Sequence, residues 1–219
     1  MGNEGENPQQ SNGEETPEEE NGNNEEPTES LGLAAEDEFT REFLVSTEEE
    51  EEGFYRMRGE LGGFEMLMPK DAELGEMFHQ TEEDAVERMT YFQNDGENGT
   101  NVTTHFYYHN EFSGASRESY LKAFANEMDF GNEFELTELD NKQSYTGETE
   151  RSINGKRVLV YIAYIFSSEN KEAISIEYNV VCRGNDDACD IDDIKERETF
   201  NKIINSIEFS FYKQEDSNE

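Results

Sequence analysis

The chain has 219 residues, and its 54 Asp and Glu against 17 Lys and Arg give a formal net charge of −37 at pH 7. Such a charge repels nucleic acid phosphates and anionic lipid head groups, which argues against both as direct ligands and favours cationic partners or solubility alone. No stretch approaches the roughly eighteen continuous apolar residues of a membrane span.

Residues 1–53 are predicted to form a disordered acidic tether. They combine Glu, Asn, Gly, Pro, Ser and Thr with a single basic residue, Arg41. Low hydrophobicity and like charge cannot offset the entropy of the chain. Within this tether, residues 31–45 carry apolar side chains that could form a short helix or a docking segment. Residues 213–219 are expected to form a second disordered tail.

The N-terminus lacks the basic start and apolar core of a signal peptide. A tail rich in Gly, Asn, Glu, Pro and Ser resembles the tether of bacterial lipoproteins, in which a lipid-bearing Cys precedes small residues such as Gly2 and Asn3. This resemblance implies an extracytoplasmic domain at the surface of a Gram-positive bacterium, anchored through a lipidated Cys in the place of Met1. An ordinary cytosolic start is the alternative.

Residues 54–212 are expected to form a single α+β domain that opens with a β-hairpin. Aromatic and β-branched residues occur from Phe54 onward at the density of an ordinary domain. Residues 54–60 and 64–68 flank a glycine turn, and Pro69 ends the second strand.

A second hairpin is predicted from the turn-rich run at 94–99. Residues 86–92 and 101–108 flank this run and would be its two strands. Residues 86–92 lack strict alternation, so a helix is the alternative there. Residues 71–83 are expected to be a loop or a short helix.

The first main helix is predicted to begin after Ser116, which can cap it, and to end near Gly131. Its apolar residues share one face. They are Tyr120, Leu121, Phe124, Ala125 and Met128.

Four strands are predicted after this helix. Residues 134–139 and 143–153 come first, and the Asn-Gly pair at 154–155 is the strongest hairpin signal in the chain. Residues 157–166 form a nearly continuous apolar run typical of a central strand, and residues 173–182 are its expected antiparallel neighbour.

The second main helix is predicted from about Asp192 to Ser206, with its inward face formed by isoleucines and Phe200. Residues 209–212 could form a last short strand. The elements together predict one antiparallel sheet with two main helices packed on it.

Two cysteines, Cys182 and Cys189, enclose six residues. In an exported protein this spacing predicts a disulfide that staples the turn before the last helix and stabilises it by roughly 2–3 kcal/mol. Free thiols and a redox pair are the alternatives, although redox motifs usually have two intervening residues.

The same turn is rich in aspartates, and Asp186, Asp187 and Asp190 could coordinate Ca²⁺ through hard oxygens. The run lacks the central Gly and terminal Glu of an EF-hand. An acidic loop with helix capping is therefore the simpler interpretation, and no other cofactor is expected.

The three histidines, His79, His105 and His109, do not form a recognisable site. His105 and His109 lie four residues apart on a predicted strand, which separates them by about 13 Å and prevents them from sharing one zinc ion. No nucleophile elbow, P-loop or dinucleotide fingerprint is present. No catalytic residue is predicted, and the chain is not expected to be an enzyme.

Two segments carry a family resemblance. Gly63–Pro69 resembles the opening "GF-x-φ-x-x-P" of PsbP-like domains, and Phe200–Phe209 resembles their last helix and its "S-φ-x-F" end. The resemblance implies an α/β/α sandwich around an antiparallel sheet. It further implies a non-enzymatic binding or assembly factor, which in bacteria is often a lipoprotein.

The function expected from these features is binding of a protein or cell-envelope component by a lipid-anchored extracytoplasmic domain. The alternatives are an envelope hydrolase that uses a carboxylate pair and an acidic scaffold. A deep pocket with convergent carboxylates would favour the hydrolase, whereas an apolar groove on the sheet would favour binding. The sequence specifies neither the partner nor the oligomeric state.

Overall fold

The computed structural model describes residues 31–96, 99–111, 116–153, 155–183, 189 and 191–210. The tether predicted for residues 1–30 and the C-terminal tail predicted for 213–219 lie outside the described residues.

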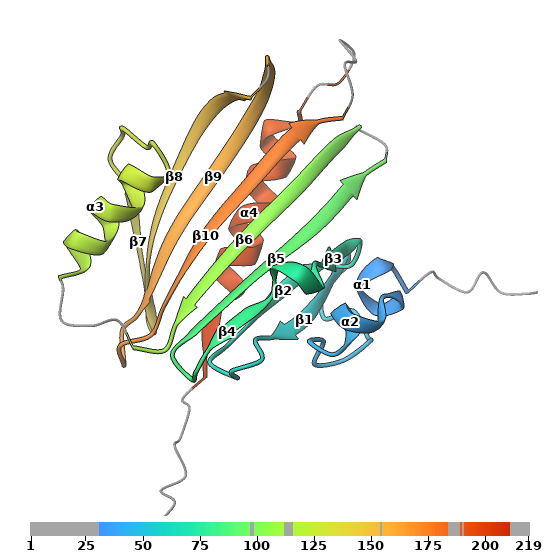
Figure 1. The fold of residues 1–219 in the computed structure, drawn as a ribbon, viewed down its shortest axis with the longest axis horizontal. Helices are drawn as coiled ribbons and strands as arrows, with labels where there is room; N and C mark the ends of the chain where they lie inside the picture. The colour runs from blue at the N-terminus through green and yellow to red at the C-terminus, as the bar shows by residue number, and fades with distance from the viewer. Residues whose placement is uncertain are drawn as a thin grey trace, which may run out of the picture. The chain divides into compact units, whose positions relative to one another are not determined.

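Within the described part of the chain, eight strands form one antiparallel sheet (Figure 1). The strand order is β3-β5-β6-β10-β9-β8-β7, and β4 pairs with the first residues of β5. The strands are β3 (Ala72–Leu74), β4 (Gln80–Glu82), β5 (Val86–Asp95), β6 (Thr100–His109), β7 (Glu135–Leu139), β8 (Lys142–Ile153), β9 (Lys156–Ser167) and β10 (Ala173–Cys182).

A smaller antiparallel sheet has the order β1-β2-β11. Its strands are β1 (Phe54–Arg58), β2 (Phe64–Pro69) and β11 (Glu208–Phe209). The helices are α1 (Leu33–Glu36), α2 (Glu38–Arg41), the 3-10 helix η1 (Glu76–Phe78), α3 (Arg117–Glu127) and α4 (Asp193–Ser206). The predicted α+β class is confirmed.

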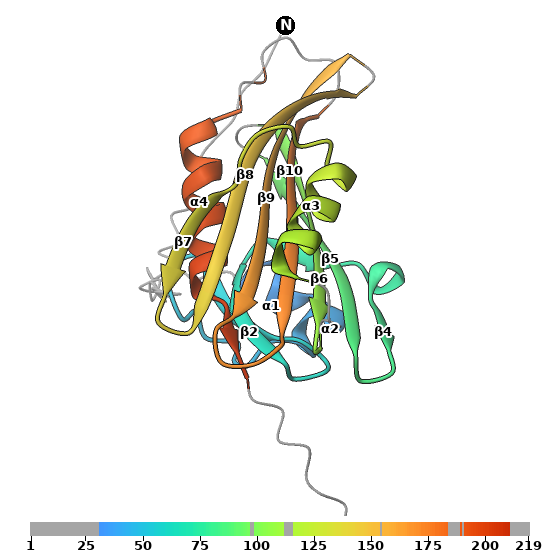
Figure 2. The same ribbon diagram turned by 90° about the vertical axis from the view of Figure 1, so that its left-hand side faces the viewer.

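The large sheet has a different hydrophobic core on each face, because successive side chains of a strand point to opposite faces. On one face, Leu159 and Tyr161 of β9 pack in a core with α4, the small sheet and residues from α1. On the other face, Val160 and Ile162 pack with α3. Figure 2 shows α3 and α4 on opposite sides of the sheet. Because β9 is buried on both faces, nearly all of its side chains are apolar, which explains the continuous apolar run at 157–166.

Helix α4 is capped at both ends by side chains. At its N-terminus, Asp192 accepts two backbone N–H groups of the first turn at 3.1 Å. At its C-terminus, the buried ammonium of Lys142 on β8 donates to the carbonyls of Ile204 at 3.3 Å, Asn205 at 2.6 Å and Ile207 at 2.5 Å. A cation at this end satisfies carbonyls that have no partner within the helix.

Residues from Leu31 onward already belong to the domain, so the predicted boundary at residue 54 is wrong. Helices α1 and α2 pack on β3, and Ala34 and Ala35 are 0% and 2% exposed. The Thr40 hydroxyl accepts the backbone N–H of Leu74 at 2.9 Å. The apolar residues of this segment are too few to mark a core by themselves, but Ala34, Ala35 and Phe43 are buried in the core of the domain.

Two further segments differ from the expectation. Residues 71–83 contain the short strands β3 and β4 around η1 instead of a loop or one helix, because both strands pair with β5. Residues 86–92 belong to a strand, since β5 pairs with β6 over its whole length, and the helical alternative is wrong.

Candidate functional site

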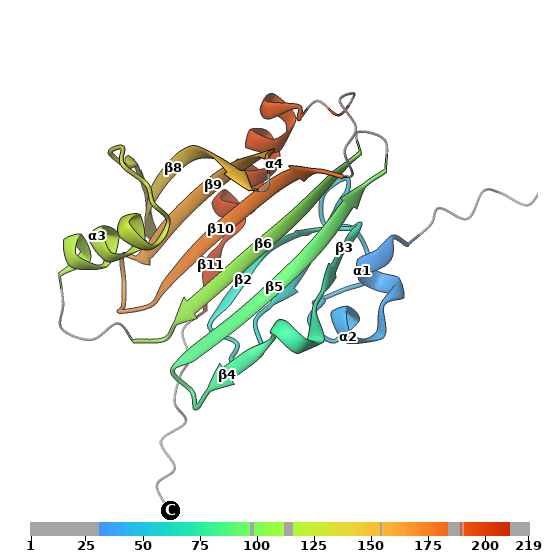
Figure 3. The same cartoon turned by 45° about the horizontal axis from the view of Figure 1, so that its top comes forward.

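A groove with a volume of about 620 Å³ lies on the α3 face of the large sheet. Its floor is formed by β5, β6 and β10, and its two walls by α3 and by the segment that contains η1. Figure 3 shows α3 and β4 on opposite sides of these strands. The groove exists because α3 covers only the β8–β9 side of this face. Its volume is typical of a site for a small molecule or a few side chains.

The walls of the groove are mostly apolar. On the η1 side, Met77 is 86% exposed and Phe78 is 53% exposed. On the α3 side, Phe124 and Met128 line the groove, and the Phe124 ring meets Tyr164 of β9 edge to face at 5.4 Å. Exposed side chains of this size, gathered at one groove, are typical of an interaction site.

The floor carries one cationic group, Arg88, which is already engaged. Its guanidinium forms an ion pair with Glu82 of β4 and donates to the Tyr107 hydroxyl at 2.5 Å. The same guanidinium lies over the Tyr107 ring, 4.5 Å from its centroid. These contacts fix both side chains on the floor and neutralise the positive charge.

Both histidines of β6 face the groove. The Nδ1 atom of His105 lies 2.9 Å from the Thr90 hydroxyl, and the His109 ring lies 4.5 Å from the Tyr107 ring, centroid to centroid. Burial, together with the nearby charge of Arg88, lowers the pKa of His109, so this ring is neutral at pH 7.

Two carboxylates line the groove, and their surroundings differ. Glu177 of β10 forms an ion pair with Arg151 of β8 at 3.0 Å, and Arg151 also donates to the Met128 carbonyl at the end of α3. Glu127 lies on the α3 wall and is exposed. The groove therefore has apolar walls and a floor whose charges are largely paired.

A second cavity of about 560 Å³ lies beside the α2 segment and contains the third histidine. The Nε2 atom of His79 is 3.3 Å from a carboxylate oxygen of Glu60 and 3.3 Å from one of Glu87. Glu87 is fully buried and also accepts the backbone N–H groups of Glu60 and Leu61. His79 thus anchors η1 to the turn after β1.

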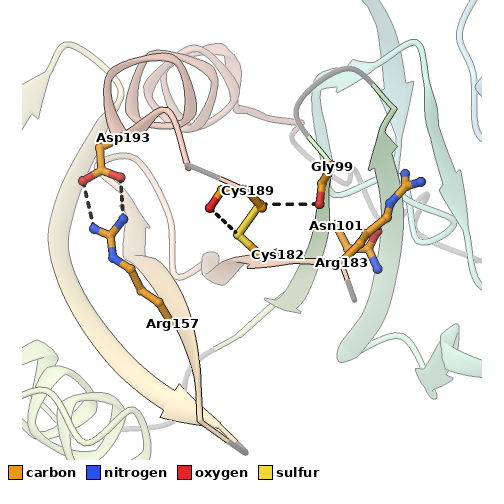
Figure 4. The surroundings of a disulfide bond; sticks show 7 residues. All are labelled: Gly99, Asn101, Arg157, Cys182, Arg183, Cys189 and Asp193. Atoms are coloured by element: carbon orange, nitrogen blue, oxygen red, sulfur yellow. Dashed lines mark hydrogen bonds and ion pairs between the residues drawn. A yellow bond between two sulfur atoms is a disulfide. The ribbon is translucent and has the colours of Figure 1, made fainter. Parts of the chain in front are cut away.

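The structure joins Cys182 and Cys189 in a disulfide with a Cα–Cα distance of 5.9 Å (Figure 4). The Cys189 sulfur lies 3.6 Å from the Gly99 carbonyl. The adjacent Arg183 forms two hydrogen bonds with this part of the chain. Its backbone N–H donates to the Gly99 carbonyl at 2.8 Å, and its Nε donates to the Asn101 side chain at 2.6 Å. The bridge thereby holds the end of β10 against the β5–β6 turn.

The predicted calcium ligands Asp186, Asp187 and Asp190 lie outside the described residues. Among the residues that are described, no group of three or more His, Cys, Asp or Glu side chains is placed to hold a metal ion. The part of the chain described here also has no helix long and apolar enough to cross a membrane.

Most groove residues were missed by sequence reasoning. The outward positions of β6 alternate as Thr103, His105, Tyr107 and His109, and this run of polar and aromatic side chains opposite a core face was the available signal. Arg88 and the exposed pair Met77-Phe78 gave no signal, because their places depend on how β4 and η1 fold against β5.

These features define a disulfide-bonded α+β domain with a ligand-sized groove on one face of its sheet. Residues 32–208 match the family described as "Putative lipoprotein YvcA", and the chain belongs to this family.

Two similar proteins show the range of the likeness. The chain is 28% identical over 192 residues to "Putative lipoprotein YvcA" of Bacillus subtilis (strain 168). This match covers 83% of this chain and 78% of the relative. A crystal structure from Bacteroides thetaiotaomicron VPI-5482 is 14% identical, with a TM-score of 0.40. The match covers 71% of this chain and 48% of that one, so this chain spans less than half of its length.

Proposed function

We propose that this protein is an extracytoplasmic, lipid-anchored binding protein of a Gram-positive bacterium, and that the α3–η1 groove holds its protein or envelope partner without catalysis. The observation that carries the proposal is the groove itself, which has exposed apolar side chains at Met77 and Phe78 and a floor whose charges are largely paired. Sites of this kind contribute affinity through apolar contact and orientation through a few fixed polar groups.

Two features support the proposed location, and a third supports the proposed role. The family and the Bacillus relative are both described as lipoproteins. Disulfides persist mainly in oxidising compartments outside the cytoplasm, and this chain has one. The two-sided packing of helices on an antiparallel sheet also fits the α/β/α sandwich implied by the likeness to PsbP-like domains, in which binding and assembly roles are common.

The absence of catalysis is proposed from the chemistry of the groove. A hydrolase with two carboxylates needs one of them protonated and the other ionised at the same bond. Glu177 is held by Arg151 in an ion pair at 3.0 Å, so its carboxylate is already engaged by another side chain of the domain. The Glu127→Gln and Glu177→Gln variants would separate the alternatives, since loss of a hydrolytic activity in both would establish the enzyme.

The location is tested with the native gene expressed in a Gram-positive host. We expect the protein in the membrane fraction, labelled by radioactive palmitate, and degraded when protease is added to intact cells. Recovery in the cytosol, protected from protease and without label, would contradict the anchored location.

The groove is tested by placing a photo-crosslinking residue at Phe78 or, as the matched control, at Ile194 of α4. Both side chains are exposed and apolar, at 53% and 68%, but Phe78 lines the groove on the α3 face, whereas Ile194 belongs to α4. Helices α3 and α4 lie on opposite sides of the sheet (Figure 2). We expect a defined adduct on intact cells from position 78 alone. Equal adducts at both positions, or none at position 78, would exclude the groove as the binding site.

A further inference from the structure

The shape of the apolar surface at the groove indicates an elongated occupant. The Phe78 ring packs edge to face on Phe92 of β5 at 5.6 Å, and Phe92 is itself 36% exposed. The apolar surface therefore continues from Met77 and Phe78 along β5, beyond the residues that line the groove. A strip of this kind suits a peptide segment with several apolar side chains better than one compact ligand.

The groove walls are able to adapt to such a segment. Methionine side chains are unbranched and flexible, so Met77 and Met128 can follow different apolar partners. In helix α3 only Phe124 is buried, although Tyr120, Leu121 and Ala125 are partly buried against the same core. A lightly packed wall can shift at small cost when a side chain enters.

Exposed carboxylates lie on the elements that form the strip and the groove walls. Glu76 precedes Met77 on η1, Glu83 follows β4, and Glu127 lies on α3, and all three are exposed. The cation on the floor, Arg88, is paired with Glu82. Together with the net charge of −37, this arrangement attracts positive charge to the edges of an apolar strip and repels an acidic partner.

We propose that the groove binds a basic amphipathic peptide segment of a partner protein, with apolar side chains against Met77, Phe78 and Phe92 and with Lys or Arg beside the rim carboxylates. This inference rests on the proposed function, because it names the partner of the same groove. A second copy of this chain fits poorly, since two chains of charge −37 repel each other.

The proposal is tested with three synthetic peptides and the 219-residue chain, using fluorescence anisotropy. One peptide of about 14 residues places Leu on one helical face and Lys on the other. The second has Glu for each Lys, and the third has Ser for each Leu. We expect the Leu/Lys peptide to bind at least about tenfold more tightly than either of the others, and to weaken as salt rises from 50 to 300 mM.

Matched variants separate the groove from general attraction to an acidic surface. Met77→Ser with Phe78→Ser should weaken binding of the Leu/Lys peptide by about tenfold or more, because the peptide then loses contact with two large apolar side chains. Ile194→Ser removes a 68% exposed apolar side chain from the other face and should leave affinity unchanged. If the double variant fails to fold by circular dichroism, Met77→Ser alone serves.

Each result decides the proposal. Equal binding by the double variant and the Ile194→Ser control would overturn it, as would equal binding of the Leu/Glu peptide. Failure of all three peptides to bind would also overturn it, and so would dimerisation through the groove in sedimentation experiments. The proposed function would survive these failures if position 78 still gave a specific adduct on cells.

Discussion

Lys142 offers a sharp test of the α4 face of the structure. Its side chain is 3% exposed, and its ammonium donates to three carbonyls at the C-terminal end of α4. Burial lowers its pKa to about 8, with smaller effects from Glu208, which raises it, and Arg56, which lowers it. The informative change is Lys142→Met, which keeps the apolar stem and removes the titrating group.

The direction and size of the change in the free energy of unfolding with pH follow from the protonation of Lys142 in the folded and the unfolded chain. Between pH 8 and about 10.5 the unfolded chain holds a proton on Lys142 that the folded chain has released, so the free energy of unfolding rises with pH. From pH 7 to pH 9.5 this gain is at most about 2 kcal/mol, because one pKa unit corresponds to about 1.36 kcal/mol. Above pH 10 the buried tyrosines reverse the trend, since burial raises the pKa of phenols such as Tyr161 to about 12.

The assay is urea denaturation followed by circular dichroism at intervals from pH 7 to pH 9.5. The wild-type chain should gain stability relative to Lys142→Met as pH rises, whereas Lys122→Met, at an exposed position on α3, should follow the wild type. Parallel pH profiles for Lys142→Met and the wild type would refute the buried cation. If that variant does not fold, Lys142→Gln keeps amide donors for the carbonyls and also lacks the titration.

Three further changes test other parts of the domain by urea denaturation. Cys182→Ser with Cys189→Ser should lower the free energy of unfolding by roughly 2–3 kcal/mol, and reductant should then have no additional effect. Phe43→Ala should cost about 3 kcal/mol, because its ring is 8% exposed, whereas no effect would show that residues 31–53 are a tether after all. Burial raises the pKa of Glu196, which accepts the Tyr178 hydroxyl at 2.6 Å, so stability falls as pH rises above about 4.5. Glu196→Gln keeps the hydrogen bond and should flatten this decline above pH 4.5, and an unchanged slope would contradict the raised pKa.

The regular part of the fold was predictable because its signals are local. The continuous apolar run of β9, the capping serine before α3 and the periodic isoleucines of α4 each identify an element from a few neighbouring residues. The turn glycines identify the hairpins in the same way. These patterns give the element types, but the prediction of a single sheet is wrong, because β1, β2 and β11 form a second, smaller sheet. Neither this division nor the strand order is visible in local patterns, since both depend on distant partners.

The start of the domain could not be found in this way. The segment from 31 to 53 is acidic and has few apolar residues, so composition places it with the tether. Its order comes from contacts with distant residues, such as Ala34 N–H to the Lys70 carbonyl at 2.9 Å and Val45 N–H to the Arg56 carbonyl at 2.9 Å. Composition reflects only the average tendency of a segment to be ordered. In this segment a few buried side chains provide enough stabilisation to order it.

The groove was hidden for a related reason, which lies in the alternation of one strand. In β6 the even positions, such as Phe106 and Tyr108, fill the core shared with the small sheet, while the odd positions, such as His105 and Tyr107, line the groove. Sequence shows this alternation but not what covers each face, since α3 lies over β9 and leaves β6 open. The same helix on β6 would have closed the groove. The placement of α3 therefore leaves the groove open over β5, β6 and β10, whereas the opposite face of these strands is filled by the core shared with the small sheet.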